Sequence, residues 1–286
     1  LIIVNLWPLT FFTLLINFFL LKKNKIIAHD HQILSKSYSK EFNNYRSYLS
    51  ISIKLTYKFS KGIIAVSNSV KNDLIKLGVK KNIIKVINNP IEIKSKKNIT
   101  VNQSKILWGA NSNFKILSIG SLKYEKDFIS IISAISKIQN NNDIKLLIIG
   151  EGDEEINIKK HIQNLNLQNN VMLIGFKENL DDYYSSADLF ISSSIHEGFG
   201  NVVADALCYG INIIATDSGG PNDILANGYY GDICKVKDVK MLAHLIEKNR
   251  KNKLTRNQIE KNFKRANDFR IEKISNEYIG YINEKI

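Results

Sequence analysis

The chain has 286 residues, of which 44% are hydrophobic, with only 15 glycines and 3 prolines. This composition excludes low-complexity and collagen-like chains and suffices for a core in two domains of ordinary size. The net charge of +13 is uneven: residues 1–112 hold 18 Lys and Arg against 4 Asp and Glu, and residues 113–286 hold 22 against 23. Such asymmetry predicts that the first half meets an anionic partner, namely a membrane surface, nucleic acid or a phosphorylated substrate, although lysines that only solvate a surface would give the same pattern.

Residues 1–21, LIIVNLWPLTFFTLLINFFLL, form an apolar run for which two interpretations compete. One is a signal anchor or membrane helix. The other is a strand, a turn, a buried helix that Pro8 opens and that ends near Leu21, and a second strand at 25–29. Pro8 and Asn17 interrupt the run and no basic segment precedes it. We therefore favour the second interpretation, a βαβ unit in a buried parallel sheet.

Short runs of Ile, Val and Leu then alternate with longer helical stretches in two successive series. The first series predicts strands at 25–29, 62–67 and 83–89 and helices around 41–60 and 69–77. Ser67 and Ser69 are suitable caps for the second of these helices. Residues 91–112 lose this periodicity and collect Lys, Asn and Ser, which predicts a linker. The second series predicts strands at 114–120, 144–150, 170–176, 188–194 and 211–217, with helices between them and a helical tail from about residue 238.

Two runs of alternating strands and helices predict an α/β protein with two doubly wound, Rossmann-like domains. We place the first domain and its linker over 1–110, the second over 111–268, and a helix packing back toward the first domain over 269–286. Ligands of such sheets bind at the carboxyl ends of the strands, near the switch in strand order. Five turns after second-series strands contain glycine, which favours a phosphate-rich ligand lying across the strand ends.

The fourth of these turns, HEGFGNVVADALCYG over 196–210, places Glu197 in a glycine loop and Asp205 about one turn into a helix. Gly198 and Gly200 permit close backbone approach, and the helix start offers free N–H groups, an arrangement that holds phosphate. Beside a phosphate a carboxylate must face hydroxyl donors, so Glu197 suits a sugar and Asp205 a ribose diol. The inferred ligand is a nucleotide sugar. An ordinary helix start, whose acids complement the helix dipole, accounts for the spacing as well.

Several segments together resemble the retaining GT-B glycosyltransferases of family four, the glycosyl transferases group 1. HEGFGNVVADALCYGINIIATDSGGPNDIL resembles the E-x7-E region of that family, GSLKYEKDF its glycine–lysine turn, and IKLLIIGEGDEE its strand ending in G-x-G. GIIAVSNSV and VINNPIEI resemble the segments that close its N-terminal domain. The resemblance covers nearly the whole chain and implies two Rossmann-like domains that transfer a sugar from a nucleotide donor.

The resemblance also assigns roles to individual residues. It implies that Glu197 contacts the donor sugar, that Asp205, one methylene shorter than the usual Glu, contacts the ribose, and that Lys126 grips the diphosphate. Ser121 stands where many members carry an arginine, so the leaving-group charge would rest more on Lys126 and on backbone N–H groups. His31 matches a histidine near the transferred sugar. The resemblance thus implies two catalytic residues, Glu197 and His31. The donor-binding residues that it implies are Gly120, Ser121, Lys126, Gly198, Phe199, Gly200, Asn201, Val202 and Asp205.

The reaction that the resemblance implies needs no metal and no cofactor, and a UDP-sugar is the favoured donor. Lys126 and a helix N-terminus would stabilise the leaving diphosphate, and the acceptor would attack the face from which it departs. We expect transfer of a hexose or N-acetylhexosamine to a lipid-linked cell-surface glycan of the lipopolysaccharide or capsule kind. The protein would be cytoplasmic and peripheral on the inner face of the membrane, where its basic half meets anionic lipid. Nucleic acid is not expected, because aromatic–basic RNA motifs are absent.

Other interpretations remain open. Family members usually begin with about two further βα units, which we do not find, so we expect an incomplete first domain and poor solubility or inactivity of 1–286 alone. A non-catalytic nucleotide-sugar-binding remnant or interaction module is therefore the alternative, and a 2-epimerase or phosphorylase of the same broad fold a third class. His29, Asp30 and His31 are residue types that bind metal ions. However, no Cys or Glu lies at the sequence spacing from them that is typical of a shared metal site. The two cysteines are expected to be buried, reduced thiols.

Overall fold

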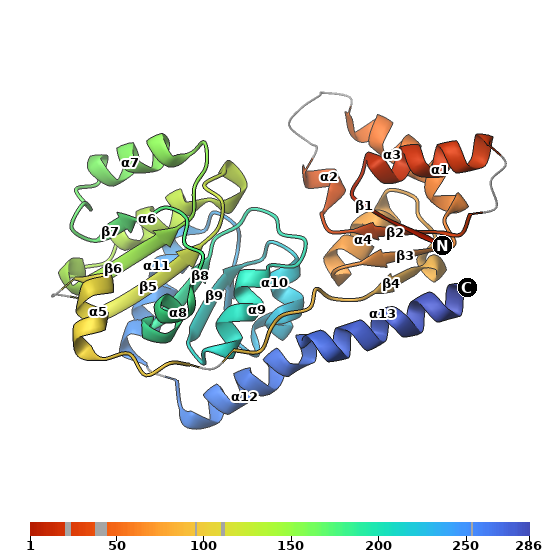
Figure 1. The fold of residues 1–286 in the computed structure, drawn as a ribbon. Helices are drawn as coiled ribbons and strands as arrows, with labels where there is room; N and C mark the ends of the chain where they lie inside the picture. The colour runs from red at the N-terminus through yellow and green to blue at the C-terminus, as the bar shows by residue number, and fades with distance from the viewer. Residues whose placement is uncertain (21–23, 38–44, 95, 110–111, 253) are drawn as a thin grey trace. The chain divides into compact units, whose positions relative to one another are not determined.

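The computed structural model describes residues 1–20, 24–37, 45–94, 96–109, 112–252 and 254–286. These residues form two compact units (Figure 1). The units are made of the following segments: the first of Leu1–Ile91, His196–Gly200 and Asp268–Ile286, and the second of Glu92–Ile195 and Asn201–Asn267. The second unit thus begins inside the predicted linker. The glycine loop at 196–200 belongs to the first unit, although the strand before it and the helix after it belong to the second.

A four-stranded parallel sheet, in the order β1-β2-β3-β4, forms the centre of the first unit. Its strands are β1 (Ile2–Asn5), β2 (Ile26–Asp30), β3 (Gly62–Ala65) and β4 (Ile84–Val86). Its helices are α1 (Leu9–Phe19), α2 (Leu34–Ser37), α3 (Tyr45–Thr56), α4 (Asn68–Lys76) and α13 (Ile271–Lys285). Strands β1 and β2 flank α1, as the βαβ interpretation predicts, and Ser67 caps α4 by accepting from the Val70 N–H at 3.2 Å. Residues 21 and 41–44 of the predicted helices lie outside the described residues.

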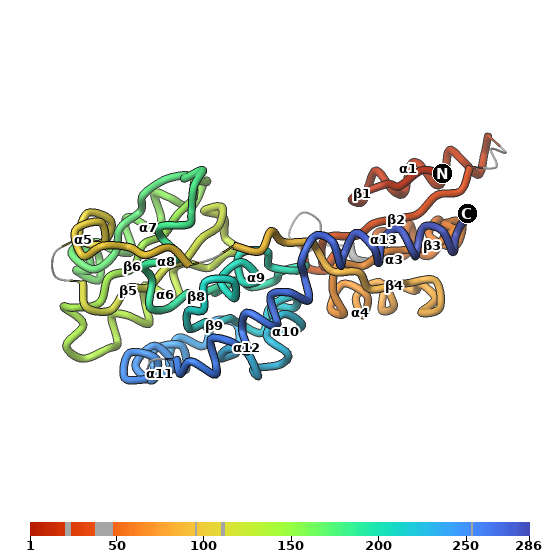
Figure 2. The backbone as a smooth tube through the Cα atoms, turned by 60° about the horizontal axis from the view of Figure 1, so that its bottom comes forward, coloured from red at the N-terminus to blue at the C-terminus, as the bar shows by residue number. Residues whose placement is uncertain are grey.

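Helices lie on both faces of this sheet because successive side chains of a strand point to opposite faces. On one face a cluster joins the sheet to α13; its buried members are Ile27, Ile64, Ile87, Ile274 and Tyr281. On the other face Asp30 accepts a hydrogen bond from Tyr57 Oη at 3.0 Å. Figure 2 shows α13 running beside β2 and β3. The C-terminal helix therefore contributes to the core of the first sheet.

Among the helices of the described ranges, none has the combined length and apolarity needed to cross a membrane.

The second unit contains a six-stranded parallel sheet in the order β10-β9-β8-β5-β6-β7. Its strands are β5 (Phe114–Ile119), β6 (Ile144–Ile149), β7 (Val171–Leu173), β8 (Leu189–Ser192), β9 (Asn212–Thr216) and β10 (Asp232–Cys234). Its helices are α5 (Val101–Trp108), α6 (Phe128–Ser136), α7 (Glu155–Asn164), α8 (Asp181–Ser186), α9 (Asn201–Cys208), α10 (Gly220–Ile224), α11 (Val239–Lys251) and α12 (Arg256–Ala266).

The order of these strands creates a switch point between β5 and β8. From β5 the chain runs outward through β6 and β7, and it returns to the other side of β5 with β8. Helices α6, α7 and α11 share a core with one face of the sheet, while α8 packs on the other through Tyr184 and Phe190 (Figure 1). The two cysteines, Cys208 and Cys234, are buried and free. The predicted doubly wound architecture is confirmed in this unit.

The structure departs from the predicted linker by forming α5 within it. Thr100 Oγ1 accepts from the Gln103 N–H at 3.2 Å, and Gln103 Oε1 accepts from the Thr100 N–H at 2.9 Å. The buried Trp108 closes the helix and donates from Nε1 to Ser186 Oγ at 2.8 Å. A capping box and one indole therefore stabilise a helix that the polar composition conceals. The three-residue edge strand β10 was likewise not among the expected strands.

Candidate functional site

The turns that follow β5 and β8 are fixed to each other at the switch point. Ser193 Oγ lies 2.8 Å from the carbonyl oxygen of Lys126 and 3.0 Å from that of Asp127, to which it donates. The Ile195 N–H donates to the Glu125 carbonyl at 2.7 Å. Lys126 is thereby held at the carboxyl edge of the second sheet, which is where doubly wound sheets bind their ligands.

Three of the five predicted glycine turns are joined at the same edge. The Gly120 N–H donates to the Ile149 carbonyl at 3.0 Å, and the Gly150 N–H donates to the Gly175 carbonyl at 3.0 Å. Gly150 has a φ of +145°, and a Cβ there would overlap the Gly120 carbonyl oxygen, so only glycine fits. The ends of β5, β6 and β7 therefore share one closely packed backbone surface.

The Lys126 side chain extends along this surface. Its Cδ lies 3.5 Å from the position that a Cβ on Gly120 would take, so its aliphatic part covers Gly120. Ser121 follows Gly120 and is exposed. The structure thus brings together three of the predicted donor-binding residues, Gly120, Ser121 and Lys126, within the second unit. A lysine ammonium beside exposed backbone at strand ends can attract a phosphate group.

The other predicted loop meets His31 in the first unit. A Cβ on Gly198 would overlap the His31 carbonyl oxygen, so the loop backbone lies directly against the residue after β2. Glu197 is half-buried in this loop. The Phe199 ring is 2% exposed and packs edge-on against Phe269 with 5.5 Å between ring centroids. The ring is therefore a core group, and only the backbone of Phe199 is left for a ligand.

Burial keeps the two neighbouring histidines neutral. His29 Nε2 is 2.7 Å from Tyr278 Oη, and the His29 and His31 rings are 3.9 Å apart at their centroids. Burial, together with the charge of His31, lowers the pKa of His29 to about 3, and burial lowers the pKa of His31. A neutral imidazole at His31 can exchange hydrogen bonds with hydroxyl groups without adding charge.

The same arrangement separates the side chains of His29, Asp30 and His31, which are residue types that bind metal ions. Asp30 points to the opposite face of the sheet from His29, because neighbours on a strand alternate. Across the described part of the chain, no group of three or more His, Cys, Asp or Glu side chains is placed to hold a metal ion. The three residues therefore do not form a metal centre there.

Asp205 lies in the second unit, one turn into α9. It lines a cavity of about 30 Å³ together with Lys94, Tyr184 and Tyr209. Burial raises the pKa of Asp205 to about 6, against the opposing effect of the Lys94 ammonium. A cavity of this size holds a water molecule but no sugar, so contact with a ribose requires the surrounding side chains to move. At the start of α9, the carbonyl of Val202 accepts from Tyr184 Oη at 3.1 Å.

Lys94 is a residue that the sequence pattern does not single out. It falls in the predicted linker, yet its Nζ lies 3.2 Å from Asp181 Oδ1. Tyr209 Oη donates to the same carboxylate oxygen at 2.6 Å. These contacts hold an ammonium group beside the Asp205 cavity. No motif marks Lys94, because its partners come from distant parts of the sequence.

Two family models match the chain. The model described as Glycosyltransferase Family 4 matches residues 1–95, and the model described as Glycosyl transferases group 1 matches residues 102–266. The two matches follow one another along the chain and together cover most of it.

Similar proteins support the same assignment. The chain is 28% identical over 229 residues to the N-acetyl-alpha-D-glucosaminyl L-malate synthase of Bacillus anthracis, covering 79% of this chain and 60% of that enzyme. It is 26% identical over 217 residues to the N-acetylgalactosamine-N,N'-diacetylbacillosaminyl-diphospho-undecaprenol 4-alpha-N-acetylgalactosaminyltransferase of Campylobacter jejuni, covering 75% of this chain and 57% of that enzyme. The chain therefore spans less than two thirds of the length of either relative.

Among solved structures, the fold resembles that of Anabaena Alr3699/HepE in complex with UDP. The TM-score is 0.85 at 20% sequence identity, over 99% of this chain and 78% of that one. The Anabaena protein has also been crystallised in complex with UDP-glucose. The likeness confirms the predicted GT-B architecture. Since the group 1 model alone matches more than half of the residues, the chain belongs to the glycosyl transferases group 1 family.

Proposed function

We propose that the protein is a retaining, metal-independent glycosyltransferase that moves a hexose or N-acetylhexosamine from a UDP-sugar to a cell-surface glycan. The observation that carries this proposal is the fixed pair of turns at the switch point, with Lys126 extended along the glycine edge. Its family and the UDP complexes of the Anabaena protein support a nucleotide donor. The name of the Campylobacter relative supports a lipid-linked acceptor.

In this proposal each predicted residue has a separate task. Lys126 and the N–H groups at the start of α9 stabilise the charge of the departing diphosphate, as preorganised donors do in other active sites. Glu197 accepts hydrogen bonds from the hydroxyls of the transferred sugar, and neutral His31 exchanges hydrogen bonds with the same sugar. Asp205 accepts hydrogen bonds from the ribose. The acceptor attacks the face from which the diphosphate leaves, and the leaving phosphate takes its proton.

The decisive experiment measures release of UDP from UDP-sugars by the protein and by Glu197→Gln. We expect the variant to lose about 100-fold or more of the rate, because the amide accepts hydroxyl hydrogen bonds less strongly than the carboxylate. Glu155→Gln, on an exposed helix of the second unit, is the matched control and is expected to turn over normally. UDP binding without turnover in all three proteins would favour the alternative, a non-catalytic nucleotide-sugar-binding module.

Donor affinity is expected to rise with pH through about 6, where Asp205 ionises. The carboxylate accepts two hydroxyl hydrogen bonds, whereas the protonated acid accepts fewer. The sign is opposite for folding: a pKa raised by burial contributes stability at low pH that is lost as the pH rises through about 6. Titration calorimetry of UDP between about pH 5 and pH 8 measures the effect on binding.

Two variants test whether Asp205 contacts the ribose. Asp205→Asn is expected to flatten the pH dependence of UDP binding, because the amide does not ionise. Asp205→Glu, which restores the usual side-chain length, is expected to tighten UDP binding. If the pH dependence persists in Asp205→Asn and Asp205→Glu binds UDP unchanged, the ribose assignment is wrong and Asp205 only complements the helix dipole.

We also propose that the first unit binds an anionic membrane surface. Four exposed apolar side chains follow one side of α1 at helical spacing: Leu9, Phe12, Ile16 and Phe19. Exposed lysines, including Lys54 and Lys58, lie on the neighbouring segment. An apolar stripe beside basic residues is typical of helices that lie in the interface of a bilayer.

Binding to vesicles of phosphatidylcholine with phosphatidylglycerol tests this membrane proposal. We expect co-sedimentation that weakens as salt rises, and at least about tenfold weaker binding for the double variant Lys54→Glu, Lys58→Glu, since each basic residue near the surface contributes about 1 kcal/mol. Lys160→Glu with Lys264→Glu, on exposed sites of the second unit, is the matched control. Equal loss in the two double variants would show only a non-specific effect of net charge.

A further inference from the structure

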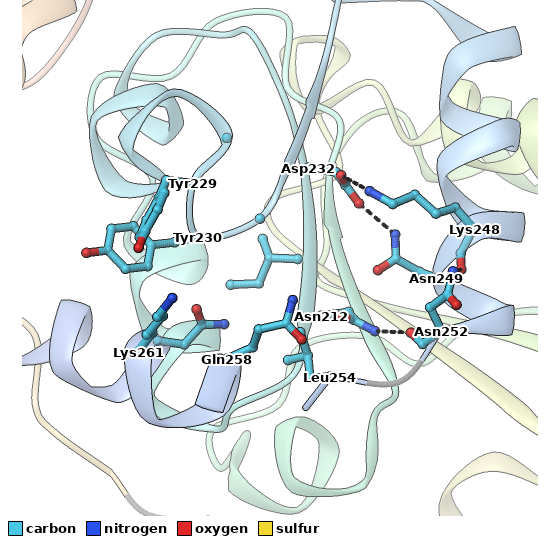
Figure 3. A pocket seen from close by; sticks show the side chains of 14 residues that line it. Asn212, Tyr229, Tyr230, Asp232, Lys248, Asn249, Asn252, Leu254, Gln258 and Lys261 are labelled. Atoms are coloured by element: carbon cyan, nitrogen blue, oxygen red, sulfur yellow. Dashed lines mark hydrogen bonds and ion pairs between the residues drawn. The ribbon is translucent and has the colours of Figure 1, made fainter. Parts of the chain in front are cut away.

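A second cavity opens at the edge of the second sheet opposite the glycine turns (Figure 3). Its volume is about 310 Å³. Two of its residues mark its position: Asn212 is the first residue of β9, and Asp232 is the first residue of β10. The cavity therefore lies at the amino ends of parallel strands, whereas the predicted donor residues of this unit follow the carboxyl ends. The proposed donor function uses none of its residues.

The polar lining of this cavity consists largely of side-chain amides. Five of them surround it: Asn212, Asn249, Asn252, Gln258 and Asn262. Asn262 is 4% exposed, and its amide atoms are not among the buried side-chain atoms of the described residues that lack a hydrogen-bond partner. Side-chain amides that line a cavity can both donate hydrogen bonds to a polar ligand and accept them from it.

The charged residues of the cavity already have partners within it. Asp232 accepts from Lys248 Nζ at 2.6 Å and from Asn249 Nδ2 at 2.9 Å, and Figure 3 shows these three side chains together on one side. Lys261 Nζ lies 5.5 Å from the centroid of the Tyr229 ring. Among the described residues that line the cavity, the carboxylate is paired and both lysines are engaged, which disfavours an anionic ligand such as a phosphate.

An aromatic face stands across the cavity from these residues. Tyr229 is 66% exposed, and Figure 3 places it with Tyr230 on the side opposite Lys248 and Asn249. The two tyrosine rings meet at 84°, so they do not form the parallel slot that would clamp a flat base. A single open ring instead suits a ligand with one apolar face.

We propose that this cavity binds neutral sugar units of a glycan. A pyranose carries C–H groups on one face, which pack against Tyr229, and hydroxyls around its rim, which exchange hydrogen bonds with the amides. The volume is at the lower end of the range of small-molecule sites, about 300–1,000 Å³, and suits one or two sugar rings. The site is remote from the glycine turns. Binding there holds a glycan chain near the protein and raises the effective concentration of that glycan chain.

Saturation-transfer NMR tests the proposal on the full chain in the presence of saturating UDP. The probes are lactose, maltotriose and N,N',N''-triacetylchitotriose. We expect at least one probe to receive saturation, with affinity about five- to tenfold weaker in Tyr229→Ala and retained in Tyr229→Trp, which keeps an aromatic face. Because Tyr229 is mostly exposed, its truncation removes little packing from the core. Tyr48→Ala, at a tyrosine of the first unit that is 70% exposed, is the matched control and is expected to bind normally.

Three outcomes would overturn the proposal: no transfer to any of the probes, equal loss in Tyr48→Ala, or a signal that UDP abolishes. The last would place the sugar at the donor site. The readout is binding at saturating UDP and not turnover, so its failure is distinguishable from failure of the proposed transferase activity, which the Glu197→Gln assay tests separately.

Discussion

Gly198→Ala is expected to destabilise the protein by about 3 kcal/mol or more and to abolish UDP release, the largest effect that we expect from a single methyl group. The added Cβ would overlap the His31 carbonyl oxygen, and a backbone atom at the end of a strand cannot move aside as a flexible side chain can. Either the loop 196–200 or the end of β2 must therefore shift. Chemical denaturation measures the loss of stability, and UDP release measures the loss of activity.

Gly280→Ala is the matched control for this substitution. Gly280 lies within α13, and a Cβ there would meet no atom within 4 Å. Since alanine favours a helix over glycine by about 1 kcal/mol, this variant is expected to be as stable as the parent or slightly more so. A Gly198→Ala protein with the parent's denaturation midpoint and turnover would contradict the close packing of the loop against His31.

Lys126→Met is expected to lower kcat/KM for the donor by about 10²–10³-fold, comparable to removing one donor of an oxyanion hole. Methionine retains an apolar chain to cover Gly120 and removes only the ammonium group. The loss therefore reports on the charge of the leaving diphosphate and not on packing. Steady-state kinetics with UDP-sugar donors and denaturation curves separate the two effects.

The neighbouring Lys123→Met provides the comparison, because Lys123 is exposed on the same turn. We expect it to retain near-parental kinetics. Equal turnover in Lys126→Met and the parent would mean that the start of α9 carries the leaving-group charge without help from the lysine. Reduced stability in Lys126→Met would instead point to a packing role for its side chain.

Most of the sheet strands were predictable because a parallel sheet covered on both faces needs continuous apolar runs. Runs such as IKLLII in β6 leave few alternatives to a buried strand. Helix α5 was not predictable from periodicity, since one buried indole, Trp108, and a capping pair stabilise it. Strand β10 is short and lies at an edge, where three residues do not show an alternating pattern.

The candidate site was predictable in its residue types but less so in their environment. The turns at Gly120, Gly150 and Gly175 lie together with Lys126 because they follow neighbouring strands of one sheet, and that order follows from alternating strands and helices. The sequence alone does not indicate that Phe199 is a core side chain packed on Phe269. Nor does it indicate that Lys94 stands beside Asp205, because both facts depend on contacts between segments distant in sequence.

The packing of α13 has a consequence for the order in which the protein folds during synthesis. The core of the first sheet includes Ile274 and Tyr281, which the ribosome adds long after β1 to β4 have emerged. Those four strands must therefore wait, with an apolar face uncovered, while the second unit is translated and folds. Chaperone demand during synthesis should accordingly be concentrated on the first part of the chain, because nascent domains with exposed apolar faces are prone to aggregate.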